Sequence, residues 1–216
     1  MNQMYEDRIE AGQVLAELLA ARHYSAISLL AVPRGGIVIA APIARLLDAR
    51  LEVLVTRKIS HPANPEVAIG AVMADGSAVL DNRLIETYAI PNTYLERTIA
   101  REYLEIQRRM MAYSGSNEPP EVKGRTAITV DDGIATGYTV RAAVKWLKLL
   151  EPQRIIIAVP VAPPDTVAEI AREVDEIICP LTPDQFMAVG LYYRNFAQNT
   201  DDEVLNVLRE VNNSRQ

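Results

Sequence analysis

Cysteine, histidine and aromatic residues are scarce in this sequence of 216 residues. A single cysteine, Cys179, cannot build a disulfide framework or a multi-cysteine metal site. No His/Cys spacing typical of a metal site occurs, and the loops Gly-x-x-x-x-Gly-Lys-Ser/Thr and Gly-x-Gly-x-x-Gly are also missing. No motif therefore supports a nucleotide hydrolase or a similar phosphate-binding protein.

Positive charge and long apolar runs are also in short supply. The net charge of −6 argues against a general nucleic-acid binder, because a phosphate backbone would meet no broad basic face. No apolar run reaches the ~20 residues of a membrane span, and residues 1–8 lack a basic start with an apolar core. We therefore expect a cytoplasmic protein with no membrane or nucleic-acid partner. With 49% hydrophobic residues, the chain predicts one α/β domain over residues 1–216.

Two adjacent acids stand between a strand and a loop of small residues near the middle of the chain. The β-branched run Ile128–Val130 predicts a buried strand, and Asp131 and Asp132 follow at its carboxyl end. The loop 133–139 then exposes backbone N–H groups at a helix start, which attract a phosphate. Carboxylates accept hydrogen bonds from vicinal hydroxyls, so this order suits a ribose 5-phosphate. The alternative is an ordinary turn in which Thr136 only caps the helix and the acids are solvated.

A second strand end carries a glycine turn with a cation. The apolar run 26–32 predicts a strand buried in a parallel sheet, and Pro33, Arg34, Gly35 and Gly36 follow it. Taken alone, this is a tight turn beside a solvated arginine. Two such loops at the ends of two strands indicate one anion-binding region instead. Strand and helix patterns alternate through most of the chain, which predicts a parallel sheet with helices on both faces and sites at the strands' carboxyl ends.

The next strand, residues 51–56, is followed by Arg57 and Lys58 and then by a stretch with two prolines, an asparagine and a serine. This composition argues against regular structure, so we expect a flexible lid loop over about residues 58–69. His61 is a candidate proton shuttle because its unperturbed pKa lies near neutrality. A solvated loop histidine is the alternative.

At residues 127–139 the sequence resembles the type I phosphoribosyltransferase family, whose signature is an aliphatic strand, two acids and a Thr/Gly-rich loop that binds 5-phosphoribosyl-1-pyrophosphate (PRPP). Many members carry an aliphatic residue where this chain has Gly133, which makes the turn more flexible. The likeness extends over most of the chain and is strongest to a branch of predicted phosphoribosyltransferases with no assigned substrate. It implies that the 5-phosphate of PRPP is held by Ile134, Ala135, Thr136, Gly137, Tyr138 and Thr139.

The resemblance also implies the remaining roles. Pyrophosphate would be bound by Arg34, Gly35, Gly36, Arg57 and Lys58, and catalysis would depend on Asp131, Asp132, Lys58 and Arg34. His61 and Glu66 would belong to the lid over the reacting centre. The cofactor would be Mg²⁺, held mainly through PRPP oxygens and water, with Asp131 and Asp132 as candidate ligands.

In this family a variable hood from the chain ends recognises the acceptor, here about residues 1–24 and 181–216. Phe186, Tyr192 and Tyr193 are candidates to stack on an aromatic base, and plain packing of the tail is the alternative. The implied function is Mg²⁺-dependent transfer of the 5-phosphoribosyl group from PRPP to a nitrogen acceptor, a nucleobase by this resemblance, with release of pyrophosphate. The alternative is a PRPP- or nucleotide-sensing regulator without turnover. We expect a homodimer.

Overall fold

The computed structural model describes residues 4–213, apart from the side chain of Glu66. Its core is a five-stranded, fully parallel sheet in the order β2-β1-β6-β7-β8. These strands are β1 (Ile27–Ala31), β2 (Leu51–Val53), β6 (Thr126–Val130), β7 (Arg154–Ala158) and β8 (Glu176–Ile178). The central strand β6 is buried along its whole length, as its β-branched run Ile128–Val130 predicts. The predicted α/β class with a parallel sheet is confirmed.

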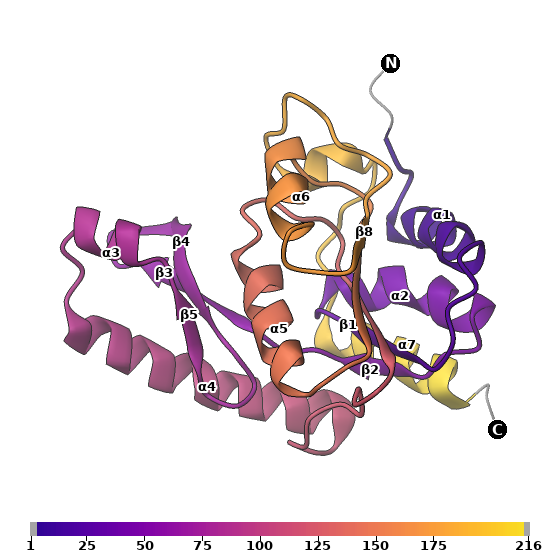
Figure 1. Ribbon diagram of the computed structural model, residues 1–216, viewed down its shortest axis with the longest axis horizontal. Helices are drawn as coiled ribbons and strands as arrows, with labels where there is room; N and C mark the ends of the chain where they lie inside the picture. The colour runs from indigo at the N-terminus through magenta and orange to yellow at the C-terminus, as the bar shows by residue number, and fades with distance from the viewer. Residues whose placement is uncertain (1–3, 214–216) are drawn as a thin grey trace.

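Helices cover both faces of this sheet (Figure 1). One face carries α1 (Arg8–Ala20), α2 (Gly35–Leu46) and α7 (Asp201–Asn213), and the other carries α5 (Tyr138–Leu149) and α6 (Pro164–Ile170). Helices α1 and α2 cross closely at Gly12, where a Cβ atom would lie 2.3 Å from the carbonyl oxygen of Ile39. Among the helices of residues 4–213, none combines the length and the apolar character needed to cross a membrane.

A separate antiparallel sheet of order β3-β4-β5 projects from the core as an arm (Figure 1). Its strands are β3 (Arg57–His61), β4 (Asn64–Val72) and β5 (Ala78–Leu80), and they are followed by α3 (Asn82–Thr87) and α4 (Asn92–Ser114). Helix α4 runs from the arm back to the core beneath the sheet in this view. Strands β4 and β5 form an antiparallel hairpin whose turn contains Asp75 and Gly76, with Gly76 at φ +85°.

The expectation that residues 58–69 form a loop without regular structure is wrong, because β3 and β4 pair there as a hairpin. Its prolines are accommodated by an irregular register. Ser60 pairs with Ala68 while His61 already pairs with Asn64, so residues 65–67 have no partner in β3 and form a bulge.

Segments near the two chain ends pair above the carboxyl edge of the parallel sheet. Tyr5 forms a parallel bridge with Tyr193, directly after the short 3₁₀ helix η1 (Val189–Tyr192). The amide of Tyr5 donates to the carbonyl of Tyr192 at 2.9 Å, and the amide of Arg194 donates to the carbonyl of Tyr5 at 2.9 Å. This pairing is the arrangement expected of a hood, whose role in acceptor recognition stays a prediction.

Candidate functional site

The predicted acid pair and the predicted glycine turn lie next to each other because their strands are neighbours. Ala31 of β1 is in register with Val130 of β6, and the amide of Val32 donates to the carbonyl of Val130 at 2.9 Å. The chain therefore leaves both strands at the same edge of the sheet. The Pro33–Arg34 peptide in this turn is cis.

Both glycines of the turn are required by the closeness of the acid pair. A Cβ atom on Gly35 would lie 2.0 Å from Oδ2 of Asp132. A Cβ atom on Gly36 would lie 2.7 Å from the carbonyl oxygen of Val130 and 3.1 Å from the Cα atom of Asp131. Any side chain at Gly35 would thus displace the Asp132 carboxylate, which ties the two sequence motifs into one site.

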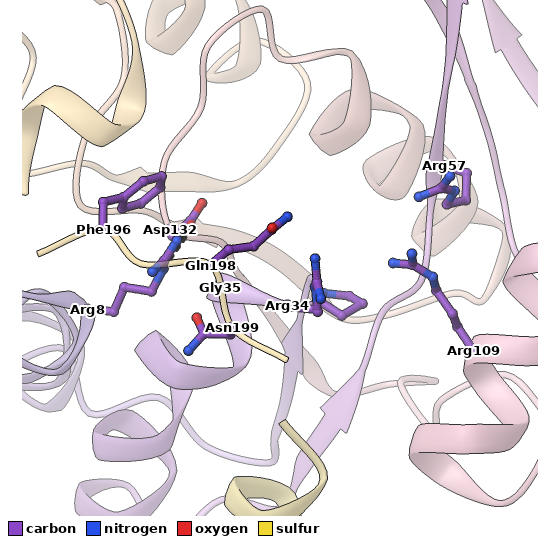
Figure 2. A pocket seen from close by; sticks show the side chains of 10 residues that line it. Arg8, Arg34, Gly35, Arg57, Arg109, Asp132, Phe196, Gln198 and Asn199 are labelled. Carbon is purple, nitrogen blue, oxygen red and sulfur yellow. Dashed lines mark hydrogen bonds and ion pairs between the residues drawn. The ribbon is translucent and has the colours of Figure 1, made fainter. Parts of the chain in front are cut away.

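Asp132 lines a cavity of about 570 Å³ whose walls are rich in arginine (Figure 2). Figure 2 shows Arg8, Asp132 and Phe196 at one end, Arg57 and Arg109 at the other, and Arg34 between them. The lining residues are Arg8, Pro33, Arg34, Gly35, Arg57, Arg109, Asp132, Phe196, Gln198 and Asn199. The lining has four guanidinium groups and one carboxylate, and carboxylates outside the lining pair with three of the arginines: Asp201 lies 3.9 Å from Arg34, while Glu102 and Glu105 contact Arg57 and Arg109. The lining therefore offers many N–H donors to an anion.

Arg8 of α1 joins the acid pair to the chain-end segment. Its guanidinium holds Oδ2 of Asp132 through Nε and Nη2, both at 2.9 Å, and Nη1 donates to the carbonyl of Ala197 at 2.8 Å. The same group lies 3.9 Å from the ring centroid of Phe196, a cation–π distance. Arg8 is buried, and all three of its nitrogens have partners.

The other acid, Asp131, lines a second cavity of about 280 Å³ together with Lys58, Ala68 and residues 133–140. Helix α5 begins at Tyr138, and its N-cap is Gly137 in the left-handed conformation, with no side-chain cap. The alternative in which Thr136 caps this helix is therefore wrong. The first-turn N–H groups stay available at a cavity that also has a lysine in its wall, which is the arrangement of an anion site.

Burial governs the electrostatics of the acid pair. It raises the pKa of Asp131 well above the ordinary range, and the neighbouring charge of Asp132 raises it further. Burial also raises the pKa of Asp132, and Arg8 opposes that rise. The backbone N–H of Asp132 donates to Oδ1 of Asp131 at 2.8 Å, which stabilises the ionised form of Asp131.

The two adjacent cations Arg57 and Lys58 do not share a cavity. Successive side chains of a strand point to opposite faces, so Arg57 enters the arginine-rich cavity and Lys58 the smaller one. Nζ of Lys58 donates to the carbonyl of Pro65 at 3.1 Å. Each cavity thus receives one of these two cations, and the expected role of both in binding pyrophosphate stays a prediction.

The predicted lid residues lie in the hairpin. His61 lines neither cavity: its Nδ1 accepts a hydrogen bond from the Ala63 amide at 3.1 Å, and its ring lies edge-on to Tyr88 at 4.8 Å. Glu66 belongs to β4, and its side chain lies outside the described residues.

The aromatics suggested for acceptor stacking pack mainly on one another. Phe186 and Tyr192 stack at 5.5 Å, and Tyr193 is buried, with its hydroxyl donating to the carbonyl of Asp132 at 2.5 Å. Neither Phe186 nor Tyr192 lines a cavity next to the acids, whereas Phe196 does. Their role in acceptor binding stays a prediction.

Sequence reasoning missed Arg8, Arg109, Gln198 and Asn199, which the fold brings to the same cavity as Arg34. Arg8 lies 124 residues from Asp132 along the chain, and Arg109 sits on α4, a helix with many charged residues, which is a pattern typical of a solvated face. The only available signal was the position of Arg8 and of residues 198–199 within the predicted hood. Within residues 4–213, no group of three or more His, Cys, Asp or Glu side chains is arranged to hold a metal ion.

Comparisons with known proteins agree with this geometry. A family model described as the phosphoribosyl transferase domain matches residues 2–194. The Mycobacterium tuberculosis protein named "Putative phosphoribosyl transferase Rv0571c" is 39% identical over 202 residues, which are 94% of this chain and 46% of that protein. The chain thus spans about half the length of the curated relatives it matches.

Solved structures give the same result. The crystal structure of TT1426 from Thermus thermophilus superposes with a TM-score of 0.80 at 38% identity, covering 97% of this chain and 99% of that one. The AQ2163 protein from Aquifex aeolicus, at 12% identity and a TM-score of 0.52, covers 85% of this chain and 76% of that one and shares the fold. From the family match and these likenesses, the chain belongs to the phosphoribosyl transferase domain family.

Proposed function

We propose that this chain binds PRPP across its acid pair and transfers the 5-phosphoribosyl group to a nitrogen acceptor such as a nucleobase, with release of pyrophosphate. One observation carries the proposal. Asp131 and Asp132 separate two cavities, of which one contains a helix N-terminus and the other contains four arginines. PRPP has the same order of groups, with a phosphate at one end, a diphosphate at the other and ribose hydroxyls between them.

In this proposal the 5-phosphate occupies the smaller cavity. The first-turn N–H groups of α5 donate to its oxygens, and Lys58 supplies a nearby positive charge. The ribose hydroxyls donate to Asp131, and the diphosphate extends over Gly35 towards Arg34 and Arg57.

The reaction forms a bond between the acceptor nitrogen and C1 of the ribose and breaks the bond from C1 to the diphosphate oxygen, which keeps the electron pair. Positive charge develops on the ribose and negative charge on the leaving group. Fixed charges that match both sites lower the barrier without a covalent intermediate on the protein. Asp131 lies beside the positive charge and Arg34 beside the negative one, while Arg8 holds Asp132 in place.

The donor set fits Mg²⁺, because the acid pair offers carboxylate oxygens at the cavity wall and the remaining ligands would be PRPP oxygens and water. When bound, the ion would neutralise the leaving diphosphate. Asp131 and Asp132 are the residues that would hold it.

The expected homodimer is a further proposal, which analytical ultracentrifugation would test.

Calorimetric titration tests the proposal directly. PRPP with Mg²⁺ should bind, and ribose 5-phosphate should bind more weakly because it lacks the diphosphate. Absence of PRPP binding would refute the proposal. A double variant, Asp131→Asn with Asp132→Asn, should stay folded but lose PRPP-dependent product formation.

Mass-spectrometric screening of purine, pyrimidine and other nitrogen acceptors then separates turnover from sensing. A new phosphoribosylated product that requires PRPP identifies the acceptor. PRPP binding with no product from any acceptor would favour the regulator instead.

A further inference from the structure

We infer that Arg109 of α4 binds the leaving diphosphate together with Arg57, and that Glu102 and Glu105 are positioning residues that aim the two arginines into the cavity. The inference rests on the proposed function, and it adds residues from a helix that the family signature does not include. It starts from the end of the arginine-rich cavity that lies farthest from Asp132 in Figure 2.

The two arginines are held in the same way. Nε of Arg57 donates to Oε2 of Glu102 at 2.8 Å, and Nε of Arg109 donates to Oε1 of Glu105 at 2.7 Å. Each bond uses the inner nitrogen of the guanidinium. Among the described side chains, the terminal amino groups of Arg57 and Arg109 have no further hydrogen-bond or ion-pair partner, while both residues line the cavity.

This arrangement presents two forks of N–H donors to one ligand. A guanidinium fork matches the oxygens of a phosphate, and a bidentate contact is stronger and more directional than that of a point charge. Two neighbouring guanidinium groups repel each other unless carboxylates compensate them. Glu102 and Glu105 are three residues apart on α4 and therefore share one face of the helix, so a single element fixes both forks.

The burial of Glu102 argues against a purely superficial ion pair. Glu102 is only 7% exposed, and Oε1 also accepts hydrogen bonds from Nε and Nη2 of Arg101, at 3.0 and 2.8 Å. A buried carboxylate is costly unless it is fully paired. Arg108 and Arg109 likewise compensate Glu105, and their hydrogen bonds lower its pKa to about 2. Glu105 thus stays charged near neutral pH.

Calorimetric titrations with inorganic pyrophosphate and Mg²⁺, and in parallel with ribose 5-phosphate, test the inference. Arg109→Ala should weaken pyrophosphate binding by about tenfold to a hundredfold, as expected for the loss of hydrogen bonds between charged groups. It should leave ribose 5-phosphate binding unchanged. Arg109→Lys should give an intermediate loss, because it keeps the charge and removes the fork.

Arg108→Ala is the matched control. Arg108 lies on the same turn of α4 and also contacts Glu105, but its side chain is 57% exposed and does not line the cavity. The pyrophosphate affinity of the Arg108→Ala variant should equal that of the parent protein. Equal affinities in Arg109→Ala and the parent would overturn the inference, and so would an equal loss in Arg108→Ala.

Glu102→Gln tests the positioning role. It should weaken pyrophosphate binding without changing ribose 5-phosphate binding, whereas a merely structural role would lower the melting temperature and leave the ratio of the two affinities unchanged. Binding by the parent protein shows whether the proposed function or only this inference has failed. If it binds neither ligand, the proposed function fails. If it binds both and Arg109→Ala changes neither affinity, only this inference fails.

Discussion

Arg8→Met should destabilise the protein through the charge that it leaves behind on Asp132. Methionine has a similar volume but removes two contacts of 2.9 Å to Asp132, the 2.8 Å bond to the Ala197 carbonyl and the cation–π contact with Phe196. Asp132 would then face Asp131 without a compensating cation. Because both carboxylates are largely buried, water replaces the lost guanidinium poorly.

Removal of one partner from a buried ion pair costs roughly 3–5 kcal/mol. The side chain of Asp132 is 20% exposed to solvent, so the low end of that range applies. We expect a loss of about 3 kcal/mol in the free energy of unfolding. For a chain of this length, this loss lowers the melting temperature by roughly 6–12 °C.

The loss in the free energy of unfolding of Arg8→Met should be smaller at low pH. Without Arg8, the pKa of Asp132 in the folded state rises further above its unfolded value of about 3.9. The folded variant then binds more protons than its unfolded chain, so its stability recovers as the pH falls towards 4. Urea denaturation of parent and variant at pH 7 and pH 4 measures the effect. The double variant with Asp132→Asn should recover part of the loss at pH 7. An equal deficit at both pH values would refute the reasoning.

Three further predictions concern single residues. Gly35→Ala should abolish PRPP binding in calorimetry, because its Cβ atom would lie 2.0 Å from the Asp132 carboxylate. The control Gly124→Ala, at φ +68° with open space around it, should cost only about 1–2 kcal/mol of stability and leave binding intact. Asp131→Asn should raise the melting temperature at pH 7, where burial disfavours the charged carboxylate, while weakening PRPP binding; a lower melting temperature would contradict this. Cys179, whose pKa burial raises to about 12, should react with thiol reagents at pH 8 only after urea unfolds the chain.

Local patterns predicted the parts of the site that depend on neighbouring residues. The strand that ends at Val130, the acids after it and the glycine turn after Ala31 are each encoded within a few residues. Their proximity followed from the rule that parallel strands share a carboxyl edge. The register of Ala31 with Val130 confirms it.

Contacts between distant segments could not be predicted in this way. Arg109 reaches the cavity only because α4 runs back from the arm to the core, and nothing local distinguishes it from Arg108. Residues 58–69 of the arm were misjudged because Pro62 and Pro65 argue against strands. In the fold, Pro62 falls in the hairpin turn and Pro65 in the bulge, where neither needs a ladder hydrogen bond.

The placement of Glu102, Glu105 and Arg109 on one helix gives this wall of the cavity a linear pattern, Glu-x-x-Glu-x-x-x-Arg. A one-residue insertion between Glu102 and Glu105 would turn the second anchor by about 100° around the helix axis and separate the two forks. Homologous proteins that use this wall in the same way must therefore have no insertion or deletion between Glu102 and Arg109, even if the exposed residues between them differ. The pattern offers a way to sort relatives that share this wall from those that retain only the loop after the acid pair.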